Sequence, residues 1–361
     1  MDTFRSSDCS TPDEFAPSRR ILVIGPPRSG TTWVEQVLGR AAGARVVHEP
    51  DNETCNPFAL RAKTSLGRFP VLAPGDPAPV AYHDLWSRAF EGIGRAATAR
   101  WLTAKALLRT ADADLDAAFD HGRTRLSARL RLISALATLP PEPLPEGPDD
   151  PPVLVKSVHA SLAAEWIVRR WRPRVVVVVR NPLNVVGSHV ALGWGPSGLD
   201  YPYLHRGLAR LGWVPAVRPG ATTLQRLAWQ IGLFFAALDA AVRRNPNWLV
   251  VSHEDLCDDP PARFASLCAA LGLPWTEEAA AFLAASDRPG KGLETRRVAS
   301  EQPTNWTRHL TAAQVEDVRR VLATFPDRVL RRSLSALGPA CPRARAGRGV
   351  RSPRSPAPGR W

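Results

Sequence analysis

The chain has 361 residues, of which 44% are apolar, so it can bury the core of one large domain or two small ones without disulfides or a structural metal. This excludes a peptide hormone and a small disulfide-stabilised scaffold. The formal net charge of +13 suggests a polyanionic partner, but nine of these charges come from arginines after Asp327, where no acid occurs. We therefore do not expect nucleic acid to be a partner of the main body of the chain.

The cysteines and the first residues bear on where the protein works. The five cysteines are irregularly spaced and form no C-x-x-C pair, which favours free thiols in a reducing, cytoplasmic environment over disulfides or a zinc ribbon. The first twenty residues are polar, so no signal peptide is expected, and no apolar run reaches the roughly 18 residues of a membrane span. We expect residues 1–19 to be disordered.

Short apolar strands alternate with helices along the first half of the chain. The run at 20–25 is β-branched and ends in glycine, which is typical of a strand buried on both faces of a parallel sheet. A helix is predicted at 32–41 and a second strand at 44–48. Residues 81–139 have Ala, Leu and Arg at helical spacing and are interpreted as a helical cap, whereas the prolines at 140–152 predict an exposed loop.

The same alternation continues in the second half, where strands are predicted at 153–155, 174–179 and 248–252. Helices are expected at 161–170, from 181 onward, and at 222–244, 260–271, 276–285 and 311–336. Residues 193–220 are interpreted as an irregular lid and 339–361 as a disordered basic tail. This order predicts an α/β fold, with a P-loop-like parallel sheet flanked by helices, in one domain at 20–338.

The strongest motif follows the first predicted strand. Residues 25–32 have the spacing G-x-x-x-x-G-T-T, in which Thr31 replaces the lysine of a nucleotide-hydrolysing P-loop. The glycines let the backbone approach a phosphate, and the N–H groups at the start of the following helix point toward it. The hydroxyl groups of Thr31 and Thr32 can donate two further hydrogen bonds. The loop is therefore predicted to bind an anion.

The strand at 174–179 argues against a kinase or a nucleotide hydrolase. Such enzymes need an acid at the end of a neighbouring strand to hold Mg²⁺, whereas this strand is followed by Arg180. A P-loop kinase or NTPase stays the alternative function, but metal-dependent phosphoryl transfer is disfavoured. Arg180 and Ser188, about two helical turns further on, can instead share one phosphate at the crevice where open α/β sheets bind ligands.

Two motifs together resemble the sulfotransferase family. Residues 27–33, P-R-S-G-T-T-W, resemble the 5′-phosphosulfate loop of that family, and residues 180–188, R-N-P-L-N-V-V-G-S, resemble its 3′-phosphate motif R-x-P-x-x-x-x-x-S. The resemblance extends over residues 20–325 and is weaker at 50–150 and 193–222. It implies that the sulfuryl donor is 3′-phosphoadenosine 5′-phosphosulfate (PAPS), that the product is 3′,5′-ADP and that no metal is needed.

The resemblance also assigns the residues that bind the donor. It implies that Arg28 stabilises the leaving group, and because arginine keeps its proton this role is expected to be electrostatic. Trp33 matches a position that stacks on adenine in some members, and packing of Trp33 into the core is the alternative. Arg180 and Ser188 would bind the 3′-phosphate. The loop residues that would contact the 5′-phosphosulfate are Arg28, Ser29, Gly30, Thr31 and Thr32.

A general base must accept the proton of the acceptor, and the end of the second strand offers two candidates. Glu49 resembles the catalytic glutamate of carbohydrate- and tyrosine-sulfating members, and we favour it. His48 is the rival, since cytosolic aryl and steroid sulfotransferases use a histidine, although in a K-[TS]-H context that is missing here. His159 is a third candidate. Lys156 is interpreted as a contact to the sulfuryl group or to the acceptor, with an exposed strand-end lysine as the alternative.

Two further regions are expected to surround the substrates. In the basic loop at 288–305, Arg296 and Arg297 resemble residues that close over the 3′-phosphate, although the usual R-K-G-x-x-G is absent. The helical cap and the lid are predicted to form the acceptor pocket, and its candidate walls are Trp194, Tyr201, Tyr203 and Trp213. By analogy, the acceptor is expected to be a small molecule, a glycan or a lipid headgroup. The sequence assigns neither the exact acceptor nor an oligomeric state.

Overall fold

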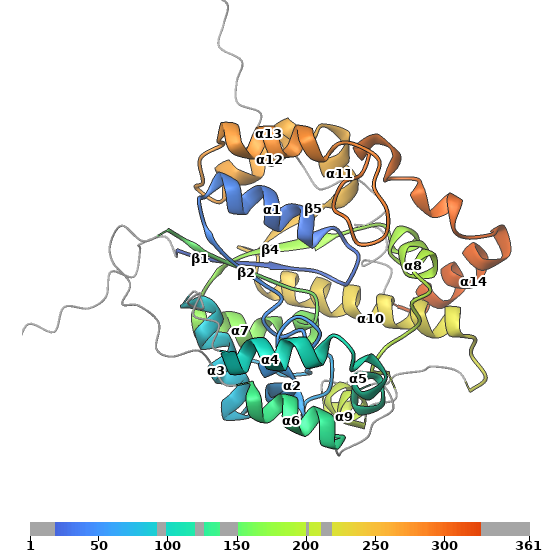
Figure 1. The fold of residues 1–361 in the computed structure, drawn as a ribbon. Coiled ribbons are helices and arrows are strands. Elements are labelled where there is room, and N and C mark those ends of the chain that lie inside the picture. The colour runs from blue at the N-terminus through green and yellow to red at the C-terminus, as the bar shows by residue number, and fades with distance from the viewer. Residues whose placement is uncertain are drawn as a thin grey trace, which may run out of the picture.

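The computed structural model describes residues 19–91, 99–119, 126–137, 151–199, 202–210 and 219–325 (Figure 1). The basic tail, the end of the helical region predicted at 311–336, most of the proline-rich loop and nearly all of the predicted disordered start lie outside these residues. The predicted pocket walls Tyr201 and Trp213 and the side chain of Tyr203 lie outside them as well. The predicted domain limits, 20–338, therefore stay a prediction.

The described part of the chain forms a sheet of five parallel strands in the order β2-β3-β1-β4-β5. The strands are β1 (Arg20–Ile24), β2 (Arg45–His48), β3 (Val153–Ser157), β4 (Arg174–Val179) and β5 (Leu249–Ser252). The central strands β1, β3 and β4 are mostly apolar and are buried on both faces, as their runs of Val, Ile and Leu predict. The predicted α/β fold with a parallel sheet is confirmed.

Three helices cover one face of the sheet. They are α1 (Thr31–Ala41), α12 (Pro260–Ala270) and α13 (Glu277–Ser286), which lie above the strands in Figure 1. Alternate residues of a strand point to opposite faces, and Ile21 and Val23 of β1 are the ones that pack into this layer. The two residues are fully buried.

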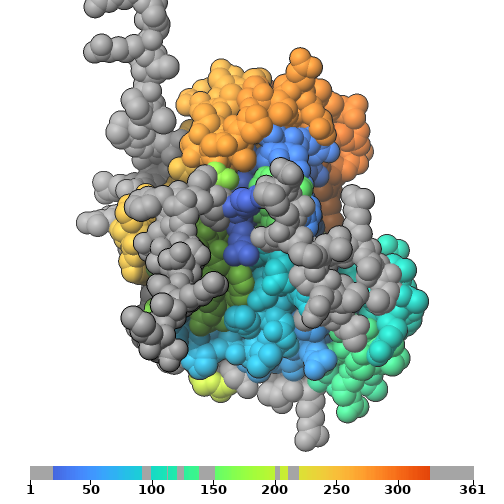
Figure 2. Space-filling model, turned by 90° about the vertical axis from the view of Figure 1, so that its left-hand side faces the viewer, coloured from blue at the N-terminus to red at the C-terminus, as the bar shows by residue number. Residues whose placement is uncertain are grey.

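A second layer covers the other face. Its helices next to the sheet are α3 (Val80–Phe90), α7 (Ala164–Trp171) and α10 (Thr223–Arg244). The remaining apolar residues of β1, Leu22 and Ile24, are fully buried in this layer. Figure 2 shows the start of the described chain, in deep blue, between the orange helices of the first layer and the cyan helices of the second.

The predicted helical cap at 81–139 is mostly helical in its described residues. The helices of this region are α3, α4 (Ala99–Leu108), α5 (Asp112–Phe119) and α6 (Ala128–Leu136), and α2 (Pro57–Lys63) precedes them in the chain. Tyr82, Trp86 and Phe90 of α3 are fully buried in the same cluster as the sheet residue Leu22. The cap therefore shares the main hydrophobic core and is not a separate body in the described residues.

Two predicted segments differ from the structure. The lid at 193–220 is not irregular throughout, since it contains the helix α9 (Pro202–Arg210). Leu204 and Leu208 lie about one turn apart on α9 and are buried, so packing of this apolar pair stabilises the helix. The helix predicted at 161–170 is instead a 3₁₀ turn at Ala160–Leu162 followed by α7.

The elements that flank the sheet edge follow the prediction more closely. α8 (Pro182–Ala191) begins at its proline, and the side chain of Asn181 accepts a hydrogen bond from the N–H of Leu183. α11 (His253–Asp258) follows β5 directly, and α14 (Ala312–Leu322) lies within the region predicted as helical. No helix among the described residues has both the length and the apolar character of a membrane span.

Candidate active site

The carboxyl ends of the parallel strands place the predicted site residues along one edge of the sheet. β1 leads into the loop at 25–30, β2 ends at His48 and is followed by Glu49, and β4 is followed by Arg180. In the register of the sheet, His48 pairs with Lys156 of β3, and β3 in turn pairs with β1. Residues far apart in sequence are thereby brought to a single edge.

The loop at 25–30 depends on its two glycines. A Cβ at Gly25 would lie 2.5 Å from the carbonyl oxygen of Val178, and one at Gly30 would lie 2.3 Å from the ring of His253. Gly30 also has a φ of 95°, which glycine adopts without strain. It is the N-cap of α1, whose first turn has neither a side-chain cap nor an acidic residue. The backbone N–H groups and the helix dipole at this end therefore favour an anion.

Two buried polar atoms beside the loop have no hydrogen-bond partner among the described residues. Oγ of Ser29 belongs to a fully buried residue, and Nε of Arg180 belongs to a residue that is 7% exposed. Leaving a buried polar atom unpaired costs about 1–3 kcal/mol. A bound anion would supply an acceptor for each of them, so these residues fit a phosphate-bearing ligand.

Three arginine side chains meet at this point. Nε of Arg28 donates to Oγ of Ser188 at 2.9 Å, and Nη1 of Arg180 donates to the carbonyl oxygen of Arg28 at 3.1 Å. The carbonyl oxygen of Gly292 accepts from Nη2 of both Arg28 and Arg297, at 3.4 and 2.9 Å. Burial and the charges of Arg180 and Arg297 lower the pKa of Arg28 to about 10. The like charges make this a site that a bound anion would stabilise.

The late basic loop brings Arg297, and not Arg296, to this arginine cluster. The side chain of Arg296 is 43% exposed and donates to Oε2 of Glu294 at 2.7 Å. A residue that the sequence did not single out, Gln302, accepts a hydrogen bond from Nη2 of Arg180 at 3.4 Å. The predicted contact of Arg296 with the 3′-phosphate finds no support in this position of the side chain.

Asn184 and Glu254 connect the end of the late loop at 288–305 with the residues that follow β4. Nδ2 of Asn184 donates to the carbonyl oxygen of Pro303 at 2.9 Å, and its Oδ1 accepts from the N–H of Trp306 at 3.0 Å. The carboxylate of Glu254 accepts from Nδ2 of Asn184 and from the N–H of Asn181. No sequence signal pointed to this role, because each contact joins residues that are distant along the chain.

Glu49 follows β2 directly and has a left-handed backbone with a φ of 46°. Its buried carboxylate forms an ion pair with Lys156 and accepts a hydrogen bond from Nδ2 of Asn52. Burial by itself would raise the pKa of Glu49, but the charge and the hydrogen bond of Lys156 outweigh burial and hold the pKa at about 2. Lys156 is 1% exposed, so it is paired with Glu49 and does not extend into solvent.

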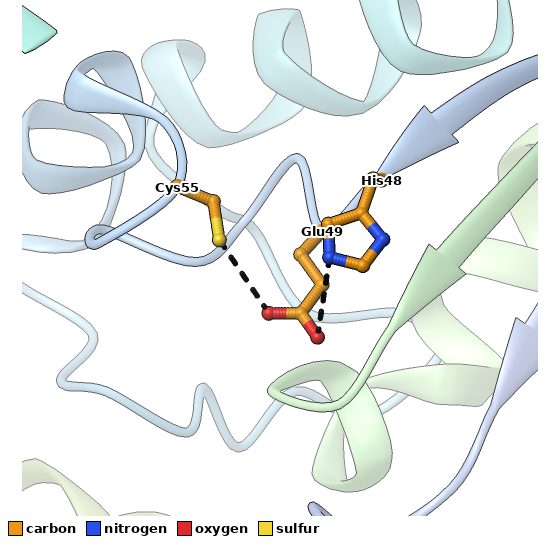
Figure 3. A group of neighbouring side chains, drawn as sticks. All are labelled: His48, Glu49 and Cys55. Atoms are coloured by element: carbon orange, nitrogen blue, oxygen red, sulfur yellow. Dashed lines mark hydrogen bonds and ion pairs between the residues drawn. The ribbon is translucent and has the colours of Figure 1, made fainter. Parts of the chain in front are cut away.

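His48 has a carboxylate partner of its own. Its Nδ1 lies 2.8 Å from Oε2 and 3.0 Å from Oε1 of Glu35, a buried residue of α1 that the sequence did not single out. Its Nε2 lies 4.0 Å from Oε1 of Glu49, the contact drawn as a dashed line in Figure 3. The side chain of His48 is 46% exposed. The structure brings His48 and Glu49 together, and both stay candidates for the base.

His159 is engaged in a different network. Its Nδ1 lies 3.0 Å from Nζ of Lys63, an ammonium group that can only donate. Lys63 is fully buried and pairs with Glu53 at 2.6 Å, and Glu53 also pairs with Arg68 at 2.8 Å. Oε2 of Glu53 lies farther from Nδ1 of His159, at 3.5 Å. Nδ1 therefore accepts from Lys63, and the neutral ring of His159 carries its proton on Nε2. Because the Nδ1 lone pair is occupied, this geometry disfavours His159 as the base.

The two aromatic residues predicted to contact substrates have different surroundings. Trp33 packs edge-on against Phe264, with ring centroids 4.9 Å apart, and lies beside His253 at 5.7 Å. This ring contacts the core of the α1 layer, and its stacking on adenine stays a prediction. Trp194 is 43% exposed, and its ring centroid lies 5.8 Å from the guanidinium carbon of Arg28. It is the predicted pocket wall that lies beside the arginine cluster.

Comparisons with known proteins point in one direction. A family model described as the Sulfotransferase family matches residues 20–277. A search of curated proteins finds no match to the chain. Among solved structures, a mouse sulfotransferase complexed with PAP shares 11% identity, with 86% of each chain covered and a TM-score of 0.39.

Two bacterial or biosynthetic structures are similar to a comparable extent. The sulfotransferase domain from the curacin biosynthetic pathway shares 12% identity, covers 85% of this chain and 98% of that chain, and has a TM-score of 0.41. A sulfotransferase from Mycobacterium avium shares 15% identity, covers 87% of this chain and 77% of that chain, and has a TM-score of 0.37.

Proposed function

The chain belongs to the sulfotransferase family, whose members transfer the sulfuryl group of PAPS, and we propose that in this chain Arg28, Arg180 and Glu49 carry that transfer to an acceptor hydroxyl or amine. The observation that supports this assignment best is the arginine cluster around the buried Arg180, beside which Oγ of Ser29 and Nε of Arg180 have no hydrogen-bond partner in the part of the chain that the structure describes. PAPS brings an activated sulfuryl group on a phosphate leaving group together with a separate 3′-phosphate. Fixed cations on two neighbouring elements suit a ligand with two anionic ends.

We assign the two ends of the donor to two parts of the site. The start of α1, with Ser29, Thr31 and Thr32, would hold the 5′-phosphosulfate, because uncapped N–H groups at a helix start favour an anion and the hydroxyls can donate further hydrogen bonds. Arg180, which follows β4, and Ser188, which lies on α8, would hold the 3′-phosphate. The buried position of Arg180 supports this role, since a desolvated guanidinium gains most from pairing with an anion.

Arg28 would stabilise the leaving group. Although burial and neighbouring charges lower its pKa to about 10, the guanidinium stays charged at neutral pH. A fixed charge beside the oxygen on which negative charge develops stabilises the transition state without reorganisation of solvent. The proposed reaction therefore uses side-chain cations and no resident metal ion.

Glu49 would accept the proton of the acceptor. While paired with Lys156 its pKa is about 2, so in that state it is a weak base. Loosening of the ion pair removes the charge that lowers this pKa, and Glu49 becomes a stronger base. Lys156, released from Glu49, could then contact the transferred group. His48, whose Nε2 lies 4.0 Å from Glu49, is the alternative base.

We propose a small-molecule acceptor, in the form of a glycan, a lipid headgroup or a natural-product alcohol. It would enter between the lid at 193–220 and the helical cap, beside the partly exposed ring of Trp194. Its hydroxyl must reach Glu49, while the rest of the acceptor packs against apolar walls. A screen of acceptors with labelled PAPS would identify it.

We also propose that the protein works in the cytoplasm. The cysteines of the described residues, Cys55, Cys257 and Cys268, are free thiols. Free thiols are typical of reducing compartments, in which disulfides do not persist.

A thermal-shift experiment tests the donor assignment against a P-loop kinase or NTPase. The kinase is not favoured, because Thr31 and Arg180 stand where it would have a lysine and a metal-binding acid. We expect 3′,5′-ADP to stabilise the protein without any metal, by about 2.7 kcal/mol at a concentration one hundred times its Kd. A shift seen only with ATP and Mg²⁺ would contradict the proposal.

A further inference from the structure

One cluster of potential metal ligands occurs among the described residues, and it lies at the end of β2. It contains His48, Glu49 and Cys55, whose candidate ligand atoms all lie within 4.8 Å of one another (Figure 3). Sγ of Cys55 is 3.8 Å from Oε2 of Glu49, and Nε2 of His48 is 4.0 Å from Oε1. Ligand atoms around a tetrahedral Zn²⁺ are about 3.3–3.6 Å apart, given its bond lengths. The separations in the cluster, which reach at most 4.8 Å, would have to contract to this spacing for three coordination bonds to form.

The tautomer of His48 favours a cation at this point. The carboxylate of Glu35 can only accept, so the neutral ring of His48 carries its proton on Nδ1 and donates it to Glu35 at 2.8 Å. The lone pair of Nε2 then faces Oε1 of Glu49, which is also an acceptor, and no hydrogen bond joins the two. A histidine whose Nδ1–H is held by a carboxylate is the usual arrangement for a ring that binds a metal through Nε2.

The polar contacts of Glu49 are compatible with this cation. Lys156 holds Oε1, and Oε2 accepts from Asn52 and from the thiol of Cys55. Replacing the thiol proton by Zn²⁺ keeps the contacts of Lys156 and Asn52, and the proton leaves to solvent. The charges of the cluster then balance. The carboxylates of Glu35 and Glu49 and the thiolate of Cys55 are negative, and Zn²⁺ and the ammonium of Lys156 carry the same amount of positive charge. The 46% exposure of the His48 side chain provides a route for the ion and an open position for a water ligand.

We propose that Nε2 of His48, Oε2 of Glu49 and Sγ of Cys55 form an inhibitory Zn²⁺ site, with Glu35 orienting the histidine. The ion occupies the lone pair that Glu49 would use as the base, so binding stops sulfuryl transfer. The inhibition rests on the proposed role of Glu49 as the general base, whereas the binding of Zn²⁺ does not depend on that role. Thiolate and imidazole ligands select Zn²⁺ over Mg²⁺, which prefers sites made of oxygen atoms.

Cobalt substitution tests the binding without any assay of activity. Co²⁺ replaces Zn²⁺ in tetrahedral sites, and a cobalt–thiolate bond gives a charge-transfer band in the near ultraviolet. We expect one equivalent of Co²⁺ to produce this band in the wild-type protein and in the control Cys268→Ala, whose thiol lies in the core of the α1 layer. Cys55→Ser should lose the band. A band that is absent from the wild type, or that persists in Cys55→Ser, overturns the proposal.

A second variant leaves all three ligands in place. Glu35→Gln removes the carboxylate that orients His48 and should weaken Zn²⁺ binding by about 10–100-fold, the usual effect of losing such an outer partner. The measurement is competition of Zn²⁺ with a chromophoric chelator. An unchanged affinity in Glu35→Gln would show that the ion does not use His48 in this orientation.

Activity then tests the inhibition. The wild type should lose its turnover of PAPS as Zn²⁺ is added and keep it with Mg²⁺, whereas the rate of Cys55→Ser, measured against its own rate without added metal, should change with neither ion. Equal inhibition of the wild type and Cys55→Ser would overturn the inhibitory site. A protein that binds Co²⁺ as expected and yet never turns over PAPS would contradict the proposed function, and the cobalt titration would still stand.

Discussion

Nε of Arg28 donates a hydrogen bond to Oγ of Ser188 at 2.9 Å, so the loop after β1 contacts the helix after β4 directly. Arg180 adds a second link through the carbonyl oxygen of Arg28 at 3.1 Å. The residues proposed to bind the two phosphate groups of the donor are thus in direct contact. Substitutions on the two elements should be coupled energetically, as contacting residues usually are.

Arg180→Ala should weaken the binding of 3′,5′-ADP by about 10–100-fold, because charge-assisted hydrogen bonds contribute about 1.5–3 kcal/mol. The binding of 5′-AMP, which lacks the 3′-phosphate, should change much less. Isothermal titration calorimetry with both nucleotides measures the difference. An equal loss for the two nucleotides would mean that Arg180 acts through the carbonyl of Arg28 and does not bind the 3′-phosphate.

Arg297 and Arg296 form a matched pair of neighbouring arginines. Arg297→Ala should weaken 3′,5′-ADP binding by about tenfold, the effect of losing about 1.4 kcal/mol, because this side chain reaches the cluster around Arg28. Arg296→Ala should leave the Kd almost unchanged, since Arg296 pairs with Glu294 at the surface. If the two variants behave in the opposite way, the late loop adopts another arrangement around the nucleotide.

Glu49→Gln should lower kcat by about 10²–10⁴-fold, the usual contribution of a general base, and leave the affinity for 3′,5′-ADP nearly unchanged. Steady-state rates with labelled PAPS, together with nucleotide titrations, measure the two effects separately. His48→Gln is the comparison. Retained activity in Glu49→Gln with lost activity in His48→Gln would assign the base to His48.

The depressed pKa of Glu49 also predicts how stability depends on pH. The folded state holds this pKa at about 2, below the ordinary value of 4.5, so its ion pair with Lys156 stabilises the fold above pH 4.5 and loses this effect as the pH falls toward 2. The loss should be about 3 kcal/mol, since each pKa unit corresponds to 1.36 kcal/mol.

Denaturant unfolding of the wild type and Glu49→Gln at a series of pH values isolates this contribution. The difference in unfolding free energy between the two proteins should be constant above about pH 5. Below that pH the wild type should lose stability relative to Glu49→Gln. A difference that is independent of pH down to 2 would rule out the lowered pKa.

The sequence predicted the parts of the site that depend on local signals. The G-x-x-x-x-G-T-T spacing after a buried strand placed the loop of Gly30, and Arg180 followed a strand of five consecutive valines. Parallel strands in one sheet present their carboxyl ends at one edge, so these two features were expected at the same edge. This reasoning needed no knowledge of tertiary contacts.

Other parts depend on contacts that no local pattern reveals. Arg296 and Arg297 are equivalent in sequence, and only the course of the loop past Gly292 distinguishes them. Glu35 has the spacing of an ordinary helix residue, and its pairing with His48 follows from the packing of α1 beside β2. The helix α9 is a different case, because the sequence does carry a signal for it. The apolar residues at 204 and 208 have helical spacing, and the prediction of an irregular lid did not use them.

The backbone of two site residues has a consequence for the evolution of the chain. Of the described residues other than glycine, three have a positive φ, and two of these are Arg28 and Glu49. Such a conformation costs roughly 1–3 kcal/mol per residue, and a glycine would relieve it while removing the reactive side chain. At Glu49 the ion pair with the buried Lys156 offsets this strain, whereas at Arg28 stability and chemistry oppose each other, so a laboratory selection for heat resistance alone would favour the loss of Arg28.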